Sequence, residues 1–586
     1  MWASRGAGSL DALCISLVQT SKLNREKGHQ RHEGISLVNL SIAESARGHH
    51  RAAAEVGQEA LRLLETSGNW ADVSAAHLNI AKGLAHLGEW ADAERHMSAG
   101  LAADGHWIEP DTFAEAAELQ AMYGDPEKAI ALIRAAIAGD AGREDCSYVR
   151  QVSARLAMLR GNWDEASRIL SSAGSSPIAP GYGSAVQSLR VQIHASAAFG
   201  DGHFELVSRE ALAFAHRQQA WFWWKSIRLT RALVSTASEL NSMLASIDSG
   251  DAAHLSIQAE LVSRRLSDLT PDALVVVTSE AHLRPERWRW PLRQILSDAS
   301  ARPSDMRIAA ELLEVVGGRS DVSILRRLAR RKTLRIHDAG RLLAKRLAPK
   351  VYVEDLGRMS LRIGDQLVAG TSIRKKVLSL LTYLLTRPQF SASREQVIDA
   401  LWPEMEPEAG ANSLNQTSYF LRHVLEPSAT DDTAANLLDS KAYLIWLDPS
   451  LVRSRSSECQ GLISVIRRDP SPELVTKLAE AYTGRFAVDF IYDDWASGFR
   501  DSLHASYLDR VERAIVADTN AGAFERALSV AQLALQADPE AEQIELCLLR
   551  LYRRMGATAA AAEQYAHYAS VLRDQLGLEP PPLESI

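Results

Sequence analysis

The stretch Gly410–Leu425, GANSLNQTSYFLRHVL, carries side chains suited to recognition chemistry. As a helix it places Leu, Ser, Leu and Leu on one face, at positions 414, 418, 421 and 425. The opposite face carries six groups that can form hydrogen bonds: Asn412, Asn415, Gln416, Tyr419, Arg422 and His423. Asn and Gln can form two hydrogen bonds with adenine, Arg can form two with guanine, and Tyr and His can donate to phosphate. We therefore predict a helix that reads DNA.

An ordinary solvated helix face is the alternative for this stretch. Such faces usually favour Glu and Lys, and neither residue occurs between Gly410 and Leu425. The DNA interpretation is therefore preferred. In it, four side chains read bases: Asn412, Asn415, Gln416 and Tyr419. Arg422 and His423 lie at the far end of the same face, closer to the DNA backbone.

Residues 351–449 supply the elements that would position this helix. Alternating apolar and polar residues with Gly at turns first predict short antiparallel strands. A leucine-striped helix then stops at Pro388, and a short helix begins at a capping box of Ser393 and Gln396. After the polar helix, two strands are expected to join at residues 439–441. Together these elements predict a winged helix-turn-helix, whose third helix enters the major groove.

The charge distribution is uneven. Residues 351–449 hold 9 Lys and Arg against 13 Asp and Glu, a balance of −4 that argues against DNA binding. Local cations could still form a phosphate-binding rim, for which we expect Arg374, Lys375 and Lys441. Residues 319–350 hold 11 basic against 2 acidic residues, or +9. This basic block, with Arg326, Arg327, Arg330 and Arg331, fits a solvated helix face and a nucleic-acid contact equally well.

The N-terminal half contains internal repeats. Glycine-led amphipathic segments begin at Gly48, Gly88, Gly124 and Gly161, which are 40, 36 and 37 residues apart. A partner helix precedes each segment, which indicates a helix-pair solenoid of the tetratricopeptide (TPR) type. Such arrays usually bind a protein, peptide or small molecule, and we prefer that role to simple spacing. The aromatic run WFWW, Trp221–Trp224, fits helix–helix core better than a ligand platform.

The bulk composition excludes several classes of protein. A chain of 586 residues needs several cores. Its four cysteines show no paired spacing, so neither a disulfide framework nor a metal site is expected, and a reducing compartment is preferred. The N-terminus has no long apolar run, so we expect a cytoplasmic protein without a membrane partner. No nucleophile motif or GxxxxGK[ST] phosphate loop occurs, so we expect neither an enzyme nor a cofactor.

These patterns predict a mainly α fold with four parts. Residues 1–250 form a TPR-like helical solenoid, and residues 251–350 form a helical connector with a basic end. Residues 351–449 form a small α+β winged helix-turn-helix domain. Residues 450–586 form an all-α, TPR-like domain.

The C-terminal half resembles a known family. LWP, NSLNQTSYFLRHVL and AYLIWLD resemble the winged helix of the bacterial antibiotic regulatory protein (SARP) family. YTGRF, DDW, and the helical segments from Ala537 and Ala559 to a proline stop resemble the bacterial transcriptional activation domain. The resemblance covers residues 351–586. Two features depart from it: the array precedes the winged helix, and Ser440–Lys441–Ala442 stands where the wing tip usually has glycine.

This resemblance implies a transcriptional regulator that acts as an activator. It implies double-stranded promoter DNA and RNA polymerase as partners, a bacterial nucleoid location, and two copies on repeated sites. The array would then sense an unknown protein or small-molecule ligand. The competing hypothesis is a helical scaffold or adaptor whose winged helix binds protein, which the acidic charge of residues 351–449 favours.

Overall fold

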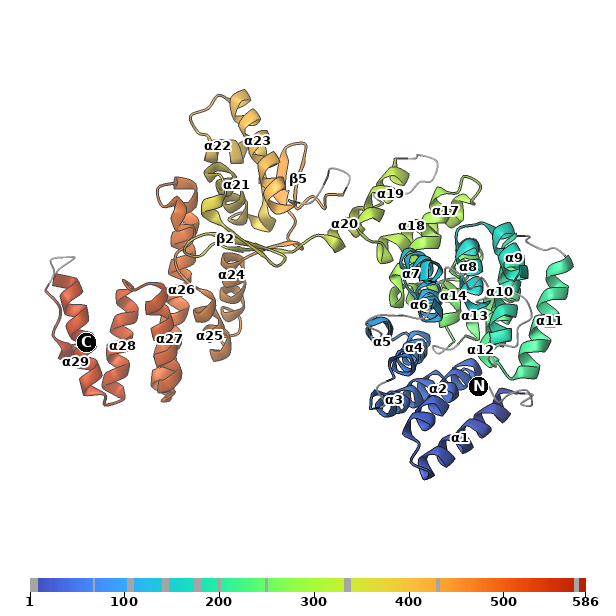
Figure 1. The fold of residues 1–586 in the computed structure, drawn as a ribbon. Helices are drawn as coiled ribbons and strands as arrows, with labels where there is room; N and C mark the ends of the chain where they lie inside the picture. The colour runs from blue at the N-terminus through green and yellow to red at the C-terminus, as the bar shows by residue number, and fades with distance from the viewer. Residues whose placement is uncertain are drawn as a thin grey trace. The chain divides into compact units, whose positions relative to one another are not determined.

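The computed structural model describes residues 9–66, 69–102, 110–139, 147–172, 182–197, 202–247, 251–330, 339–427, 430, 433–573 and 579–585. The chain divides into two compact units, residues 1–343 and residues 344–586 (Figure 1). Each unit is mainly helical, and the strands of the described residues all lie in the second unit. The predicted mainly α fold with a TPR-like solenoid, a winged helix and a helical C-terminal domain is confirmed.

The first unit is a succession of antiparallel helix pairs (Figure 1). Its helices are α1 (Leu10–Glu26), α2 (Gln30–Arg47), α3 (His50–Glu65), α4 (Trp70–Leu87), α5 (Trp90–Ala102), α6 (Pro110–Tyr123), α7 (Pro126–Gly139), α8 (Ser147–Leu159), α9 (Trp163–Ser172), α10 (Tyr182–Ala197), α11 (Gly202–Gln218), α12 (Trp221–Val234), α13 (Ala237–Ala245), α14 (Ala253–Ile257), α15 (Ala259–Ser263), α16 (Pro271–Leu283), α17 (Pro285–Ser297), α18 (Pro303–Val316) and α19 (Arg319–Ala329). A short 3-10 helix, Leu266–Asp268, follows α15, and α20 (Arg341–Leu347) crosses the boundary between the units.

The repeat glycines stop one helix and let the next one turn back. Gly48, Gly88 and Gly161 have φ angles of 92°, 86° and 79°, in the left-handed region that glycine adopts without strain. Gly124 serves a different purpose, because its backbone is not left-handed. A Cβ atom there would lie 2.4 Å from the Trp90 ring, so glycine makes room for the indole. Glycine therefore occurs at these four equivalent positions for two different physical reasons.

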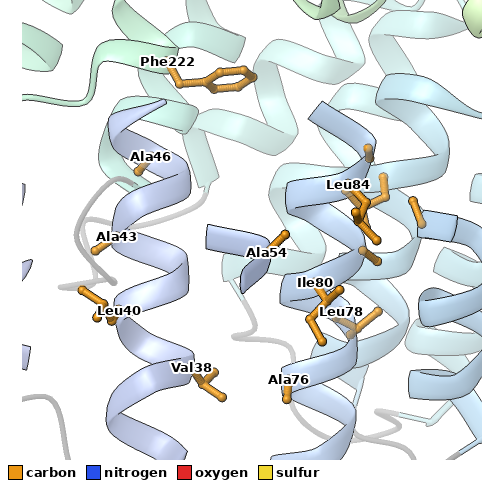
Figure 2. Close-up of a cluster of buried hydrophobic side chains, with 14 of the residues drawn as sticks. Val38, Leu40, Ala43, Ala46, Ala54, Ala76, Leu78, Ile80, Leu84 and Phe222 are labelled. Carbon is orange, nitrogen blue, oxygen red and sulfur yellow. The ribbon is translucent and has the colours of Figure 1, made fainter. Parts of the chain in front are cut away.

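Later helices of the first unit pack against earlier ones. Figure 2 shows Phe222 of α12 beside the apolar side chains of α2 and α4, such as Ala46 and Leu84. Phe222 and Trp223 are buried, whereas Trp221 and Trp224 are half-buried, so WFWW supplies core and keeps two partly exposed rings. The aromatic run thus joins segments that lie far apart in the sequence.

The segment predicted as a connector also packs on the array. Arg284, between α16 and α17, donates a hydrogen bond to the carbonyl oxygen of Ala85 at 2.7 Å. Trp290 and Gln294 both donate to the carbonyl oxygen of Leu159, at 3.0 and 2.7 Å. Helices α16 and α17 are therefore part of the same compact unit as the repeats.

The second unit combines two small sheets with helices. Its strands are β1 (Val351–Glu354), β2 (Ser360–Ile363), β3 (Gln366–Ala369), β4 (Ser391–Ser393), β5 (Leu438–Lys441), β6 (Leu444–Leu447) and β7 (Val452–Ser454). The order is β3-β2-β1-β7 in one sheet, where β1 and β7 are parallel, and β4-β6-β5 in the other. Its helices are α21 (Lys375–Leu385), α22 (Arg394–Leu401), α23 (Pro407–Leu425), α24 (Arg455–Ile466), α25 (Pro472–Ala481), α26 (Asp494–Ala521), α27 (Phe524–Ala537), α28 (Glu542–Arg554) and α29 (Thr558–Val571).

The wing differs from the predicted hairpin. Residues 439–441 were expected to join the two strands, but all three belong to β5. Lys441 pairs with Leu444, and Ala442 and Tyr443 form the turn. Ala442 has a φ of 52°, a left-handed conformation that glycine usually provides in such two-residue turns. The prediction failed because the pairing of β6 with both β4 and β5 sets the register, whatever the turn-forming character of Asp439 and Ser440.

The winged helix and the C-terminal helices are bonded to each other within the second unit. The backbone N–H of Ala487 donates to the carbonyl of Asp355 at 2.8 Å, and Asp489 accepts from the N–H of Met359 at 3.0 Å. The Asp355 carboxylate also accepts from the backbone N–H of Ser456 at 2.8 Å, at the start of α24. Burial raises the pKa of Asp355 to about 6, although its bonds to Ser456 oppose the shift.

Candidate nucleic-acid interface

Helices α22 and α23 form the helix-turn-helix of the second unit. Ser393 and Gln396 form the predicted capping box at the start of α22. Residues 402–406 make the turn, and α23 begins at Pro407, three residues before the predicted helix. A Cβ atom on Gly410 would lie 2.6 Å from Ile398 Cγ2, so glycine permits the close crossing of the two helices. The start of α23 is thereby fixed against α22.

Helix α21 packs against both α22 and α23. Tyr383 is buried in α21 and donates its hydroxyl to the carbonyl oxygen of Gln396 in α22, at 3.1 Å. Burial raises the pKa of the Tyr383 hydroxyl, which keeps it a neutral donor. Arg387 lies over the Tyr383 ring, with its guanidinium carbon 4.3 Å from the ring centroid. The first two helices are therefore held in one orientation.

The two faces of α23 have the predicted polarity. Leu414, Ser418, Leu421 and Leu425 are buried. Asn412, Asn415, Gln416, Tyr419 and His423 are exposed, and the Tyr419 side chain is 55% accessible. The structure thus brings five of the six predicted polar side chains to the exposed face of one helix. Arg422 is only half-buried and has a separate set of contacts.

Arg422 binds the wing. Its Nε donates to the carbonyl oxygen of Leu438 in β5 at 3.1 Å, and an Nη atom lies 3.4 Å from Ser440 Oγ. This guanidinium therefore ties α23 to the first wing strand. It stands apart from the five exposed side chains, with which the sequence had grouped it.

Asn415 is held by a neighbouring helix. An Nη atom of Arg394, at the start of α22, donates to Asn415 Oδ1 at 2.7 Å. The Asn415 amide then keeps both N–H donors and one lone pair on its oxygen for another partner. The N–H of Arg394 also donates to the carbonyl of Tyr443 at the wing turn, at 2.8 Å. Arg394 therefore connects the second helix, the third helix and the wing.

Tyr419 and His423 form a pair at the far end of the exposed face. Their ring centroids are 4.2 Å apart, and His423 Nδ1 lies 3.0 Å from the carbonyl oxygen of Tyr419. A carbonyl oxygen only accepts, so the Nδ1 atom carries the proton, and Nε2 is left for an outside partner. Gln416 and Asn412 are exposed on the preceding turns of the same helix.

The expected phosphate contacts divide between several surroundings. The Arg374 guanidinium lies 4.1 Å from the Phe420 ring centroid, so it is next to α23. Lys375 instead lies 3.8 Å from the Asp493 carboxylate and over the ring of Phe490, which places it beside the C-terminal helices. Lys441 is exposed at the end of β5, next to the wing turn. Arg374 and Lys441 thus flank α23, whereas Lys375 faces another part of the unit.

Two residues that the sequence did not place in the site belong to its surroundings. Arg394 is not among the expected contact residues, and its bond to Asn415 depends on how α22 and α23 cross. Tyr443 projects from the wing turn with 69% of its surface accessible. A large aromatic residue between two short strand segments is the signal that could have identified it.

The basic block enters the described structure only in part. Arg331 lies outside the described residues. Lys345 is paired with the Asp448 carboxylate at the end of the wing. Arg326 and Arg327 lie in the last turn of α19, in the first unit. Both interpretations of the basic block, a solvated face and a nucleic-acid contact, therefore stay predictions.

Comparison with known proteins places the C-terminal region. Residues 467–583 match the family model described as "Bacterial transcriptional activator domain". This region is a bacterial transcriptional activator domain. The activator domain comprises α25 to α29 and follows the winged helix within one compact unit.

Two curated relatives extend the similarity. The chain is 27% identical over 225 residues to the regulatory protein AfsR of Streptomyces griseus, which is 37% of this chain and 22% of the relative. It is 26% identical over 222 residues to AfsR of Streptomyces coelicolor, covering 38% of this chain and 22% of that protein. The matched part is therefore about a fifth of each relative's length. The predicted SARP-like character of the C-terminal half is confirmed.

A solved structure, Mycobacterium tuberculosis EmbR in complex with a low affinity phosphopeptide, shares 18% sequence identity with the chain. The match covers 40% of this chain and 64% of EmbR, with a TM-score of 0.31.

Among the described residues, none of the helices has the length and apolar character needed to cross a membrane.

Proposed function

We propose that this chain is a sequence-specific DNA-binding regulator of bacterial transcription, and that it activates its promoters. The observation that carries the proposal is the row of exposed Asn412, Asn415, Gln416 and Tyr419 on the third helix of a winged helix-turn-helix. The activator domain in the same unit supports a role in transcription. RNA polymerase is the proposed protein partner, and the bacterial nucleoid is the proposed location.

In this proposal, α23 enters the major groove and its exposed amides read base edges. Gln416 and Asn412 offer both a donor and an acceptor, as paired recognition of adenine requires. Asn415 can do the same through its free amide hydrogens and the remaining lone pair of its oxygen. Tyr419 and His423 would contact the base or backbone at the far end of the helix.

The remaining cations would hold the DNA backbone. Arg374 beside α23 and Lys441 beside the wing turn lie on elements that flank the reading helix. Lys375 contributes less in this proposal, because Asp493 lies close to its ammonium group. Arg422 supports binding indirectly by holding the wing. Two such copies on repeated sites would increase the affinity for a promoter.

The helical array would act as the sensor. Stacked helix pairs expose extended surfaces to a protein or small-molecule partner. Occupation of such a surface would change the presentation of the winged helix or the alignment of two copies. We propose neither a catalytic activity nor a cofactor for this chain.

A scaffold whose winged helix binds protein is the second candidate, favoured by the −4 charge of residues 351–449. Selection of bound duplexes from a random DNA pool by the full chain separates the two. Enrichment of a defined site, lost in a variant with Asn412, Asn415 and Gln416 changed to Ala, supports the regulator. Equal recovery of all sequences, or of none, with and without these changes supports the scaffold.

A further inference from the structure

A groove on the first unit lies outside the DNA-reading surface. Helices α11 and α13 both pack against α12 and leave an open groove between them with a volume of about 1030 Å³. Its apolar lining includes Phe204, Leu212, Trp224 and Met243. Its polar lining includes Arg228 and a row of hydroxyls from α13, among them Ser238 and Ser242. The groove is therefore lined both by apolar side chains and by groups that can form hydrogen bonds.

The opposite side of α12 is occupied by a buried polar network of the chain itself. Ser226, on the opposite side of α12 from Trp224, accepts from the side-chain amide of Gln258 and from Ser188. These residues are buried, and Thr230 donates to the oxygen of the Gln258 amide at 2.9 Å. A ligand of the array would therefore have to displace a satisfied polar network there, whereas the groove is open to solvent.

Four charged side chains line the groove, Glu205, Arg228, Arg231 and the exposed Glu239, and they differ in their pairing. Glu205 of α11 accepts two bonds from one Nη atom of Arg231, at 2.8 and 3.0 Å, so this pair is neutral. Arg228 is exposed and stacks on Trp224, with 4.8 Å between its guanidinium carbon and the ring centroid. The structure gives Arg228 no acidic partner among the described residues. A stacked guanidinium keeps its edge donors free, and their fork geometry matches a carboxylate.

We propose that this groove binds a peptide segment of a partner protein that carries a carboxylate beside a large apolar side chain. The carboxylate would pair with Arg228, and the apolar side chain would cover Trp224 and Met243. The Ser238 and Ser242 hydroxyls would bond to the peptide backbone. This inference rests on the proposed sensor role of the array and gives that role a location and a ligand class.

The test uses the full chain and a pool of random dodecapeptides displayed on phage. We expect enrichment of sequences with Asp, Glu or a free C-terminus next to an aromatic or long aliphatic residue. A synthetic peptide with the enriched sequence should bind at least tenfold more weakly to Trp224→Ala and Arg228→Gln. Arg217→Gln, an exposed arginine of α11 outside the groove lining, is the matched control and should bind as tightly as the parent.

Charge reversal separates a direct contact from a loss of structure. Arg228→Glu should reject the acidic peptide and accept its Lys-substituted counterpart. Absence of enrichment, or equal binding by the parent and both groove variants, would overturn the proposal. A molar mass by light scattering that falls by half in Trp224→Ala would identify a second copy as the occupant, which also overturns it. Duplex selection is read separately, so failure here leaves the DNA result intact.

Discussion

Arg422 of α23 donates to the carbonyl oxygen of Leu438 at 3.1 Å and so attaches this helix to the first wing strand, β5. Arg422→Ala should therefore lower the free energy of unfolding of the second unit by about 1.5–3 kcal/mol, the range for a hydrogen bond that involves a charged group. Chemical denaturation of the parent and the variant measures this change. Unchanged stability together with an altered base preference would mean that Arg422 reads DNA.

Gln416 is exposed on α23 and has no role in the core. Its replacement by Ala should weaken binding to the selected site by about 1–3 kcal/mol and leave binding to random duplex unchanged. Titration of both duplexes at one salt concentration gives the two affinities. Gln366→Ala, on the exposed strand β3, is the matched control and should retain the preference. A preserved preference in Gln416→Ala would show that the register assigned to the reading helix is wrong.

Lys441, at the end of β5, is expected to contact phosphate. Lys441→Ala should weaken binding to every sequence by a similar factor and reduce the slope of log affinity against log salt by about one. Affinities measured across a series of salt concentrations report the slope. Lys477→Ala, an exposed lysine of α25, serves as the control. A loss confined to the selected site would contradict the phosphate role.

Arg284 holds the segment after α16 against the array. It pairs with the Glu280 carboxylate, donates to Ala85 and lies 4.9 Å from the Tyr123 ring centroid, all in buried surroundings. Arg284→Ala would leave Glu280 as a buried unpaired acid and should cost about 3–5 kcal/mol of stability in the first unit. The double change Arg284→Leu with Glu280→Leu should cost less. Equal losses from the single and double changes would mean that packing, and not the charge, is responsible.

Three buried histidines surround Phe222 in the first unit. Burial lowers the pKa of His50 to about 4 and of His254 to about 3, and it holds the pKa of His86 well below its usual value. The neighbouring ammonium of Lys225 lowers the pKa of His50 and His254 further. All three rings are therefore neutral in the folded protein near pH 7.

The sign of the pH dependence follows from these shifts. An unfolded histidine has a pKa of about 6.5, so below that pH the unfolded chain binds more protons and stability falls. Above it the contribution is constant. Urea denaturation from pH 7.5 to 5 should show no loss from these histidines above about pH 6.5, and below it a loss that approaches about 1.4 kcal/mol per pH unit for each histidine. His254→Leu should reduce the slope, and His216→Leu, at an exposed site, should not; equal slopes in all three proteins would refute the assignment.

The local features of the helix-turn-helix could be predicted because they depend on neighbours in the sequence. The buried stripe through Leu414 and Leu421 follows helical periodicity, and the Ser393–Gln396 box follows its spacing. The bond from Arg394 to Asn415 could not be predicted, because it depends on the crossing of two helices. The predicted position of the wing turn was wrong for the same reason. It depends on the pairing of β5 with β6, which places the turn at Ala442 and Tyr443.

The long-range contacts of the first unit also could not be predicted from local sequence patterns. Arg284 and Ala85 are 199 residues apart, and no repeat period relates them. The sequence marked the start of each repeat by glycine, but Gly124 fits around Trp90 and does not make a left-handed turn. The sequence period therefore predicts where the helix pairs lie. The contacts that pack these pairs into one unit are seen only in the three-dimensional structure.

The parallel pairing of β7 with β1 has a consequence for how such proteins can be assembled in evolution. β7 lies after the wing and leads into α24, yet it completes the sheet that begins the winged helix. A gene fusion with its break between the wing and β7 would leave that sheet one strand short, and it would separate Asp355 from the helix start it caps. The winged helix and the C-terminal helices of the second unit should therefore be inherited and exchanged together.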